Sequence, residues 1–531
     1  MSRSSKNITC VSLRNPESPE IRAANASGFI QHVEFIRTAN GGQTASKLEV
    51  APETVRPRSL RSVFPAPKFA SEKLVRLIRI IAVAVLCFLL TPVASAQETW
   101  KAGVAKANIT PPQPMWMSGY ASRSKPAEGK SHDLWAKAIV LEDPAGKRLI
   151  LVTLDLVGID RETSLQICSR LQKEHNIDRS QIALSTSHTH SGPVVGTNLL
   201  AMFALDEPNL KLIRDYTVFL SDSVAKAVSD AVASMAPASI STGESQASFA
   251  VNRRNNREPD VPMLREKGML VGPVDHDVPV LSVRTPEGKL RAVVFGYACH
   301  ATVLSLMDWS GDWPGFAQLE VEKRHPDAIA MFWAGCGADQ NPIPRRTVEL
   351  AMEYGRQTAD AVDRALQSPM TPVTGSLKSV YREIDLAFAH IPSAEEIQKD
   401  LKASDVYIAR RAMTLEKVMA RDGKLSPTYP YPVQMWAIGD HVKMTFLGGE
   451  VVVDYAVRLK AELPGRSNWI SGYSNDVMGY IPSGRVLMEG GYEGESSMIY
   501  YGQPSKWAPG IEENIVSTVQ EISKEISAGT K

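Results

Sequence analysis

The stretch Gln181 to Pro193, QIALSTSHTHSGP, decides the fold expected for this chain. It begins as a short apolar run and ends in His188 and His190, followed at once by a Ser-Gly-Pro turn that a regular strand cannot accommodate. This pattern predicts a strand that delivers two imidazoles into a tight loop. Residues two apart on a strand point the same way, so both imidazoles can face one pocket. One hypothesis is a metal site, because neutral imidazole is a common zinc ligand. The other is that both are hydrogen-bonded loop residues.

Other apolar runs also end in polar residues or glycine turns. The predicted strands are Trp100–Ile109, Leu134–Leu141, Arg148–Leu156 with Asp155, Leu290–Cys299 before His300, Ala328–Ala334 before Asp339, Val442–Leu447 before Glu450, and Trp469–Tyr473 before Tyr480. Helical spacing predicts helices over Thr163–His175, Asn209–Met235, a segment ending near His325, Val451–Leu463 and Glu512–Ala528. Residues 240–275 are predicted to be irregular. The alternation predicts an α/β fold with a mixed central sheet, helices on both faces, and a site at the carboxyl ends of the strands.

Convergence of these strand ends favours the metal hypothesis. Two or three histidines and one carboxylate from separate strands suffice for a catalytic zinc with one position open for water. Taken singly, Glu450 is equally well explained as an acid at a helix N-terminus, and Tyr480 as a packed aromatic. No G-x-S-x-G turn, phosphate-binding loop, H-E-x-x-H or C-x-x-C occurs in the sequence.

The front of the chain differs in charge from the rest. Residues 1–96 contain 13 of the 59 basic and 6 of the 58 acidic residues, so residues 97–531 have a net charge of −6. The apolar segment Ile80–Leu90 follows three basic residues and precedes Ala94-Ser95-Ala96. This pattern predicts a signal peptide over residues 71–96, cleaved near Ala96, and a secreted or periplasmic protein. The apolar core is too short to span a bilayer comfortably, so no membrane span is expected in the mature chain. Residues 1–70 are predicted to be a disordered or non-native leader.

Three of the five cysteines, Cys168, Cys299 and Cys336, lie in the mature chain. An odd number at wide spacing does not indicate a disulfide framework. Cys299 and Cys336 are either a pair or two small buried side chains.

Several motifs together resemble the N-terminal catalytic domain of neutral ceramidases, across about residues 102–502. The motifs are an early Asn-Ile-Thr-Pro, STSHTHSGP, Asn252-Arg253, Val274-Asp275, the strand ending Cys299-His300-Ala301-Thr302, the Gly-Gly-Glu450 turn, and the closing SNDVMGYIPSG and GGYEG. The resemblance implies that residues 97–531 form one catalytic domain without the immunoglobulin-like C-terminal domain of the family.

By this resemblance the zinc ligands fall on His188, His300, Glu450 and Tyr480. His190 and Arg253 fall on active-site positions, and Tyr492 on a tyrosine that helps to polarise the substrate carbonyl. The implied reaction is hydrolysis of the amide bond of N-acylsphingosine by a zinc-bound water, giving a sphingoid base and a fatty acid. His190, left off the metal, is expected to move a proton towards the leaving amine.

Two features depart from the family pattern. The family's G-D-x-S-P-N loop is GADQNP in this chain, with Gln340 or its neighbour at the serine position. Because that loop is expected near the substrate, the change bears on ceramide specificity. The insertion Ser393–Lys424 has helical periodicity and either covers the pocket or packs on the surface.

Three functions therefore stand as hypotheses: an exported zinc amidase acting on ceramide or another long-chain N-acyl amine, a zinc hydrolase of a different amide or ester, and an inactive metal-containing lipid- or glycan-binding protein. The expected partner is a lipid or other small amide substrate, and the charge distribution does not indicate nucleic acid. The sequence leaves the oligomeric state open. An apolar groove for two alkyl chains would favour the first hypothesis over the second.

Overall fold

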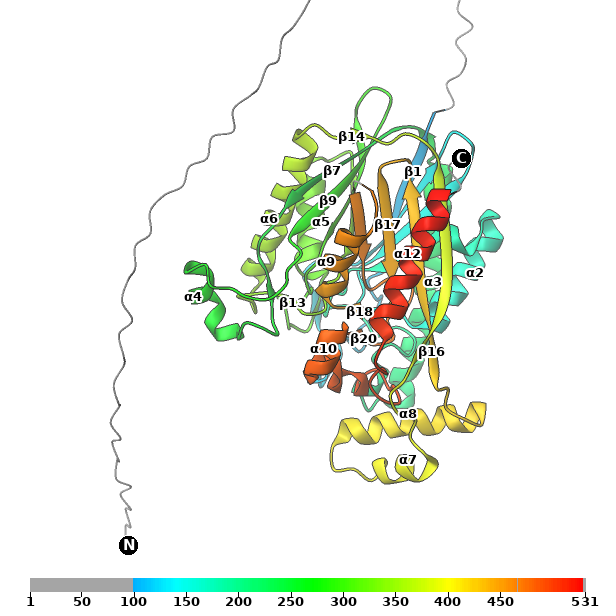
Figure 1. The fold of residues 1–531 in the computed structure, drawn as a ribbon, viewed down its shortest axis with the longest axis vertical. Coiled ribbons are helices and arrows are strands. Elements are labelled where there is room, and N and C mark those ends of the chain that lie inside the picture. Colours follow the sequence, from blue (N-terminus) through cyan, green and yellow to red (C-terminus); the bar gives the residue numbers. More distant parts are fainter. Residues whose placement is uncertain (1–98, 466, 529–531) are drawn as a thin grey trace, which may run out of the picture. The chain divides into compact units, whose positions relative to one another are not determined.

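The computed structural model of the protein describes residues 99–528 except residue 466 (Figure 1). The predicted leader and signal peptide lie outside these residues. Within the described part of the chain, no helix is both long and apolar enough to cross a membrane.

Three mixed sheets contain most of the strands, and they repeat one topology. In each sheet, three successive strands are antiparallel, and the third leads through a helix into a parallel strand at the edge. The first sheet comprises β1 (Lys101–Asn108), β3 (Trp135–Glu142), β4 (Arg148–Leu154), β5 (Ile182–Thr186) and a short β6 (Ala236–Pro237). The second comprises β7 (Ser239–Gln246), β9 (Asp277–Arg284), β10 (Leu290–Tyr297), β12 (Ile329–Ala334) and a short β14 (Thr371–Pro372). The third comprises β15 (Leu377–Ala387), β16 (Thr428–Ile438), β17 (Val442–Leu447) and β19 (Ser467–Ser471).

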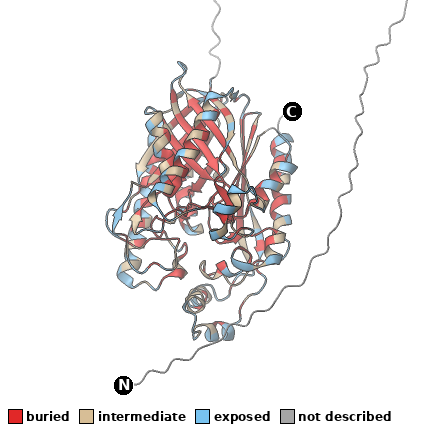
Figure 2. Cartoon of the chain, turned by 90° about the vertical axis from the view of Figure 1, so that its left-hand side faces the viewer, coloured by how far each residue is buried: buried red, intermediate tan, exposed pale blue. Residues whose placement is uncertain are grey.

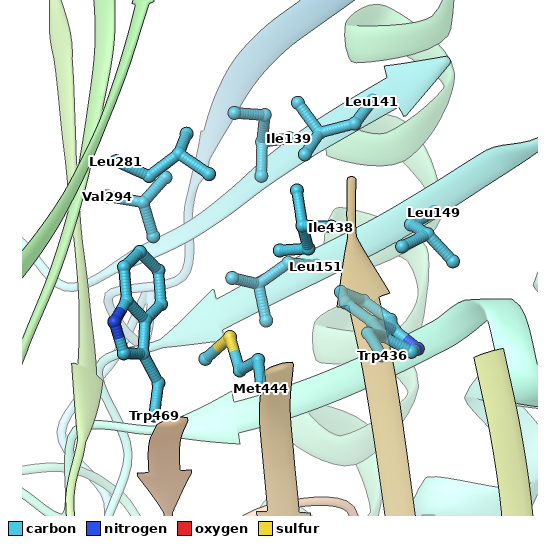
Figure 3. A pocket seen from close by; sticks show the side chains of 10 residues that line it. All are labelled: Ile139, Leu141, Leu149, Leu151, Leu281, Val294, Trp436, Ile438, Met444 and Trp469. Atoms are coloured by element: carbon cyan, nitrogen blue, oxygen red, sulfur yellow. The ribbon is translucent and has the colours of Figure 1, made fainter. Parts of the chain in front are cut away.

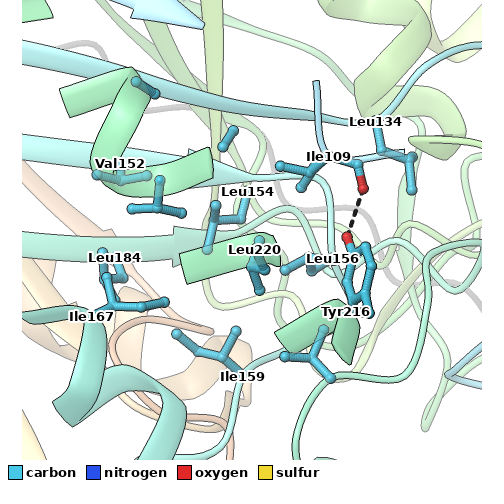
Figure 4. Close-up of a cluster of buried hydrophobic side chains, with 14 of the residues drawn as sticks. Ile109, Leu134, Val152, Leu154, Leu156, Ile159, Ile167, Leu184, Tyr216 and Leu220 are labelled. Atoms are coloured by element: carbon cyan, nitrogen blue, oxygen red, sulfur yellow. Dashed lines mark hydrogen bonds between the residues drawn. The ribbon is translucent and has the colours of Figure 1, made fainter. Parts of the chain in front are cut away.

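Two long helices accompany each sheet and cover its outer face. They are α2 (Arg161–His175) and α3 (Glu207–Ala233) on the first sheet, α5 (Asp312–Arg324) and α6 (Val348–Gln367) on the second, and α9 (Val453–Glu462) and α12 (Ile511–Ala528) on the third. Local sequence sets where they begin: the side chains of Asp160, Asp206 and Thr347 cap α2, α3 and α6. Figure 4 shows one of these sheet–helix cores, in which Tyr216 of α3 donates a hydrogen bond to the carbonyl of Ile109 (2.6 Å).

The inner faces of the three sheets pack against one another in one shared apolar cluster. Ile139 and Leu151 come from the first sheet, Leu281 from the second, and Met444 and Trp469 from the third; they line a small apolar cavity where the sheets meet (Figure 3). Central strands such as β3, β4 and β10 are therefore buried on both faces, and Figure 2 shows the buried interior in red. The predicted mixed α/β class is confirmed. However, the expected single sheet with helices on both faces is instead three sheets, each with helices on one face and sheets on the other.

The prediction that residues 240–275 are irregular is wrong. They contain β7, β8 (Ala250–Asn252) and α4 (Val261–Glu266). Strand β7 has the sequence SISTGESQ and buries only Ile240 and Thr242 among its eight residues. Hydrogen-bonded pairing with β9 and β14 keeps this polar segment in the sheet. Because the segment has no apolar run, its sequence does not indicate a strand.

The insertion Ser393–Lys424 folds as α7 (Ala394–Asp400) and α8 (Val406–Asp422), below the rest of the molecule in Figure 1. Helix α8 is tied to neighbouring loops: Tyr407 donates its hydroxyl hydrogen to the carbonyl of Ala121 (3.3 Å), and Arg410 binds the carbonyl of Met202 (2.5 Å).

Cys168, Cys299 and Cys336 are buried and unpaired, so the two near the site are small core side chains rather than a disulfide.

A loop after β19 joins the third sheet to the first. Asn475 accepts a hydrogen bond from the backbone N–H of Leu184 (3.2 Å) and donates one to Gln434 (2.8 Å). Next to it, Asp476 is buried and accepts a hydrogen bond from the hydroxyl of Tyr429 (2.6 Å) through one carboxylate oxygen. Its other oxygen has no partner among the described residues. Burial therefore raises the pKa of Asp476 to about 7.

We expect Asp476→Asn to change how stability depends on pH. The folded chain binds the Asp476 proton more tightly than the unfolded chain, so the wild type loses stability as pH rises from about 4 through 7, by up to about 4 kcal/mol. The variant lacks this loss. Thermal unfolding at pH 5 and pH 8 measures this loss of stability. Between pH 5 and pH 8, the melting temperature of the wild type should fall relative to that of the variant. An equal difference at both pH values would contradict the assignment.

Candidate metal centre

Loops from all three sheets meet at the carboxyl ends of the strands. His188 and His190 follow β5, His300 follows β10, Glu450 opens β18 (Glu450–Val451) after β17, and Tyr480 opens β20 (Tyr480–Ile481) after β19. Two parallel bridges place these loops side by side. Thr189 pairs with Ala301, which brings the three histidines together. Glu450 pairs with Tyr480, which brings the carboxylate next to the phenol.

The side chains of the four expected ligands converge within hydrogen-bonding distances. Oε2 of Glu450 lies 3.0 Å from Nε2 of His188 and 3.2 Å from Nε2 of His300. The hydroxyl of Tyr480 lies 3.4 Å from Nε2 of His300. All four residues are between 1% and 3% exposed. The four side chains are therefore shielded from solvent, whereas His190 beside them retains partial exposure.

Backbone carbonyls fix the tautomers of two imidazoles. Nδ1 of His188 lies 2.6 Å from the carbonyl oxygen of Val157, and Nδ1 of His300 lies 2.8 Å from that of Gly337. Since a carbonyl oxygen can only accept, each Nδ1 carries the hydrogen. Each Nε2 then presents its lone pair to the centre, which is the arrangement of metal-binding histidines.

Charges at the centre agree with these tautomers. Burial, together with the Arg253 guanidinium, lowers the pKa of His300 to about 4, and burial with the neighbouring imidazoles lowers the pKa of His190 well below its usual value. His190 and His300 are therefore neutral beside the carboxylate of Glu450.

These donors fit a metal ion. The ligand nitrogens of His188, His190 and His300 lie within 4.8 Å of one another, so this group can hold one. Oε2 of Glu450 is buried and has no hydrogen-bond donor among the described residues. An uncompensated carboxylate oxygen facing imidazole lone pairs is costly without a cation between them. Nitrogen and oxygen donors of this kind suit zinc.

The predicted active-site residues surround the same centre. Arg253 donates from Nη2 to the hydroxyl of Tyr480 (3.1 Å) and from Nε to Glu493 (2.7 Å). The ring of Tyr492 lies 5.2 Å from that of Tyr480 and is 41% exposed. Nε2 of His190 lies 3.1 Å from Nε2 of His188. All seven predicted residues are brought together.

Three other residues considered from the sequence have structural roles. Asp155 binds the backbone N–H of Trp135 (3.0 Å), and Asp339 binds that of Val453 at the start of α9 (2.8 Å). Gln340 is fully buried and bonds to the carbonyl of Ala298 (2.6 Å), so the altered side chain of the GADQNP loop points into the protein. Its neighbour Asn341 is the loop residue that contacts Arg253 (3.2 Å).

Several residues around the centre carry no recognisable sequence signal. The ring of Tyr473 packs at 4.3 Å on that of His188, and Tyr120 packs at 4.8 Å on His190. Gly119 has φ +93°, and a Cβ added there would lie 2.5 Å from the ring of His190. Gly119 therefore allows this imidazole to lie against the backbone. Tyr501 donates a hydrogen bond to Oε1 of Glu450.

We expect Gly119→Ala to displace His190. Gly146→Ala is the matched control, because Gly146 also has positive φ (+84°) but nothing within 4 Å of an added Cβ. Both changes should cost about 1–2 kcal/mol of backbone strain. Only Gly119→Ala should also weaken metal binding, measured by titration of the metal-free protein. Equal metal affinity in the two variants would show that the contact with His190 does not matter.

Fold and site together define a mixed α/β protein with a buried histidine–carboxylate group that can hold a metal ion. Residues 100–338 match the family described as neutral/alkaline non-lysosomal ceramidase, N-terminal. The resemblance predicted from the sequence is therefore confirmed.

Individual relatives agree with the family match. A neutral ceramidase of Pseudomonas aeruginosa is 24% identical over 495 residues, covering 78% of this chain and 71% of the relative. A neutral ceramidase of Drosophila pseudoobscura pseudoobscura is 33% identical over 119 residues, which span 22% of this chain and 16% of the relative. The crystal structure of the Pseudomonas aeruginosa enzyme has a TM-score of 0.60 at 20% identity and matches 80% of this chain and 75% of its own. This last similarity concerns the fold.

Proposed function

We propose that the protein is a zinc-dependent amide hydrolase that cleaves ceramide or a related long-chain N-acyl amine into a fatty acid and an amine. The observation that supports it most directly is the convergence of His188, His300, Glu450 and Tyr480, with Oε2 of Glu450 left without a donor. Zinc held there would supply Lewis-acid chemistry and activate water for attack on the amide. The names of the matched relatives support ceramide as the substrate.

The remaining residues of the centre have distinct roles in this proposal. His190 is neutral and partly exposed, so its imidazole can accept a proton at Nε2 and deliver it to the leaving amine. Tyr492 places a phenol beside the centre, where it can donate to the carbonyl oxygen of the amide. Arg253 holds the hydroxyl of Tyr480 and thereby keeps this oxygen directed at the imidazoles.

We further propose that residues 97–531 act as the mature catalytic domain, exported by the signal peptide predicted over residues 71–96. The segment Ile80–Leu90 between basic residues and Ala94-Ser95-Ala96 supports this.

Replacement of a ligand tests the metal-dependent activity. We expect His188→Ala to lose bound zinc and to reduce fatty-acid release from labelled N-acylsphingosine by about a thousand-fold, because several kcal/mol of transition-state stabilisation are removed. Elemental analysis and the release assay, with and without chelator, measure the two effects. His390→Ala is the control: this histidine is 58% exposed and pairs with Glu396 outside the centre. Full activity in the chelated protein would refute the proposal.

A hydrolase of a different amide or ester is the second candidate, and one observation favours it. A cleft borders the centre at Arg253 and Tyr492 and is otherwise lined mainly by charged and amide side chains, with Ile343 as its single aliphatic residue. Four arginines face it, against the carboxylates of Glu258 and Glu493. Such a lining suits a polar or anionic group better than an alkyl chain.

A substrate panel distinguishes the two candidates. N-palmitoylsphingosine and N-palmitoylglycine share the acyl group and the amide but differ in the other half, which is a long-chain base in one and a carboxylate in the other. If the polar cleft holds the amine half of the substrate, kcat/KM should be higher for N-palmitoylglycine. Arg257→Ala removes an 83% exposed guanidinium and should lower kcat/KM for N-palmitoylglycine about ten-fold. A strong preference for the sphingosine amide would instead favour ceramide.

A further inference from the structure

Glu450 presents its two carboxylate oxygens to different partners. Oε2 faces Nε2 of His188 and of His300. Oε1 accepts a hydrogen bond from the phenol of Tyr501. A phenol bonded to a carboxylate is a strong, charge-assisted interaction in which the phenol is the donor. One oxygen is therefore occupied by the protein, and the other is left for the centre.

The ring of Tyr501 is held firmly in place. It packs against all three cores that lie between a sheet and its helices. The segment that carries it is bonded to the loop that carries Tyr480: Trp507 donates to the carbonyl of Tyr480 (2.7 Å), and Gln503 donates to that of Met478 (2.8 Å). The phenol is thus positioned by the same elements that position the expected ligands.

Tyr480 and Tyr501 lie near the same carboxylate, but their hydroxyls differ in direction. That of Tyr480 faces Nε2 of His300 (3.4 Å) and accepts a hydrogen bond from Arg253 (3.1 Å). That of Tyr501 is directed at the carboxylate oxygen on the side away from the imidazoles. The two phenols therefore have different roles.

We propose that Tyr501 is a positioning residue, which holds Oε1 of Glu450 so that the metal is bound through Oε2 alone. This inference rests on the zinc centre proposed above. Without the phenol hydrogen, Oε1 is a buried acceptor with no donor, and the carboxylate is free to rotate and to offer both oxygens. Partners of metal ligands typically contribute 10- to 100-fold to metal affinity.

Tyr501→Phe removes only the hydroxyl, and the adjacent residue offers a matched control. The ring of Tyr500 contacts Tyr407 and Tyr492, and its hydroxyl has no hydrogen-bond partner in the described part of the chain. Tyr500→Phe therefore removes a hydroxyl one residue away without touching Glu450. Zinc affinity of the metal-free chains, measured by competition with a chromophoric chelator, should fall at least about ten-fold for Tyr501→Phe and stay unchanged for Tyr500→Phe.

Two further readouts separate positioning from a general loss of structure. The visible absorption of the cobalt-substituted protein should change in Tyr501→Phe only, since it reports the ligands around the metal. In a Glu450→Gln background, Tyr501→Phe should cause no further loss of zinc affinity. These comparisons remain informative if Tyr501→Phe lowers the melting temperature of the metal-free chain.

Wild-type affinity and an unchanged cobalt spectrum in Tyr501→Phe would overturn the inference while leaving the zinc centre in place. An equal loss of affinity in the Glu450→Gln background would also overturn it, because Tyr501 would then act elsewhere. A wild-type chain that binds no zinc would overturn the proposed function together with this inference.

Discussion

The hydrogen bonds from Nδ1 of His188 and His300 to backbone carbonyls are the interactions on which the centre depends. They direct both Nε2 lone pairs towards Oε2 of Glu450. Without a fixed tautomer, either imidazole could present an N–H to the carboxylate and form an ordinary ion pair. With it, the structure brings lone pairs and a negative charge together, which is stable only around a cation.

The repeated topology explains why these groups meet. Each sheet provides two loops at its carboxyl edge, one after the third strand and one after the parallel strand. In the first sheet these loops carry Val157 and His188, in the second His300 and Gly337, and in the third Glu450 and Tyr480. Because the inner faces pack in one shared cluster, the six loops cannot separate without opening that core. Each fixed imidazole is held by a carbonyl from the other loop of its own sheet.

The sequence predicted the long strands and helices because these are buried strands and amphipathic helices with clear periodicity. It also indicated the seven residues that meet at the centre. His188, His190, His300, Glu450 and Tyr480 followed from the strand ends, and Arg253 and Tyr492 from the family resemblance alone; their roles stay predictions. His188 and His190 face one place, as predicted, but the expected cause was wrong. Strand β5 ends at Thr186, and His188 has φ +59°, so the two imidazoles face one place through a left-handed turn and not through strand alternation.

What the sequence did not predict depends on contacts between distant segments. The polar strand β7 forms because β9 and β14 pair with it. Tyr501 follows an equally plausible Tyr500, and only the packed structure shows which hydroxyl reaches Glu450. Gly119 lies about 70 residues before His190 in the chain, and its role is a steric fit that no local pattern records.

The expected metal ligands and the residues that line the adjacent cleft form two distinct sets in this structure. The expected ligands come from loops that are bonded across the repeated sheets, so changes there disturb the core. Other segments form the surfaces beside the centre: α8 lies near the loop containing Ala121, and the cleft is formed by the segments around Arg254, Arg345 and Tyr492. Gln340, which departs from the family pattern, is bonded inside the protein and cannot itself contact a substrate. We therefore expect substrate specificity to depend on these surfaces and not on Gln340.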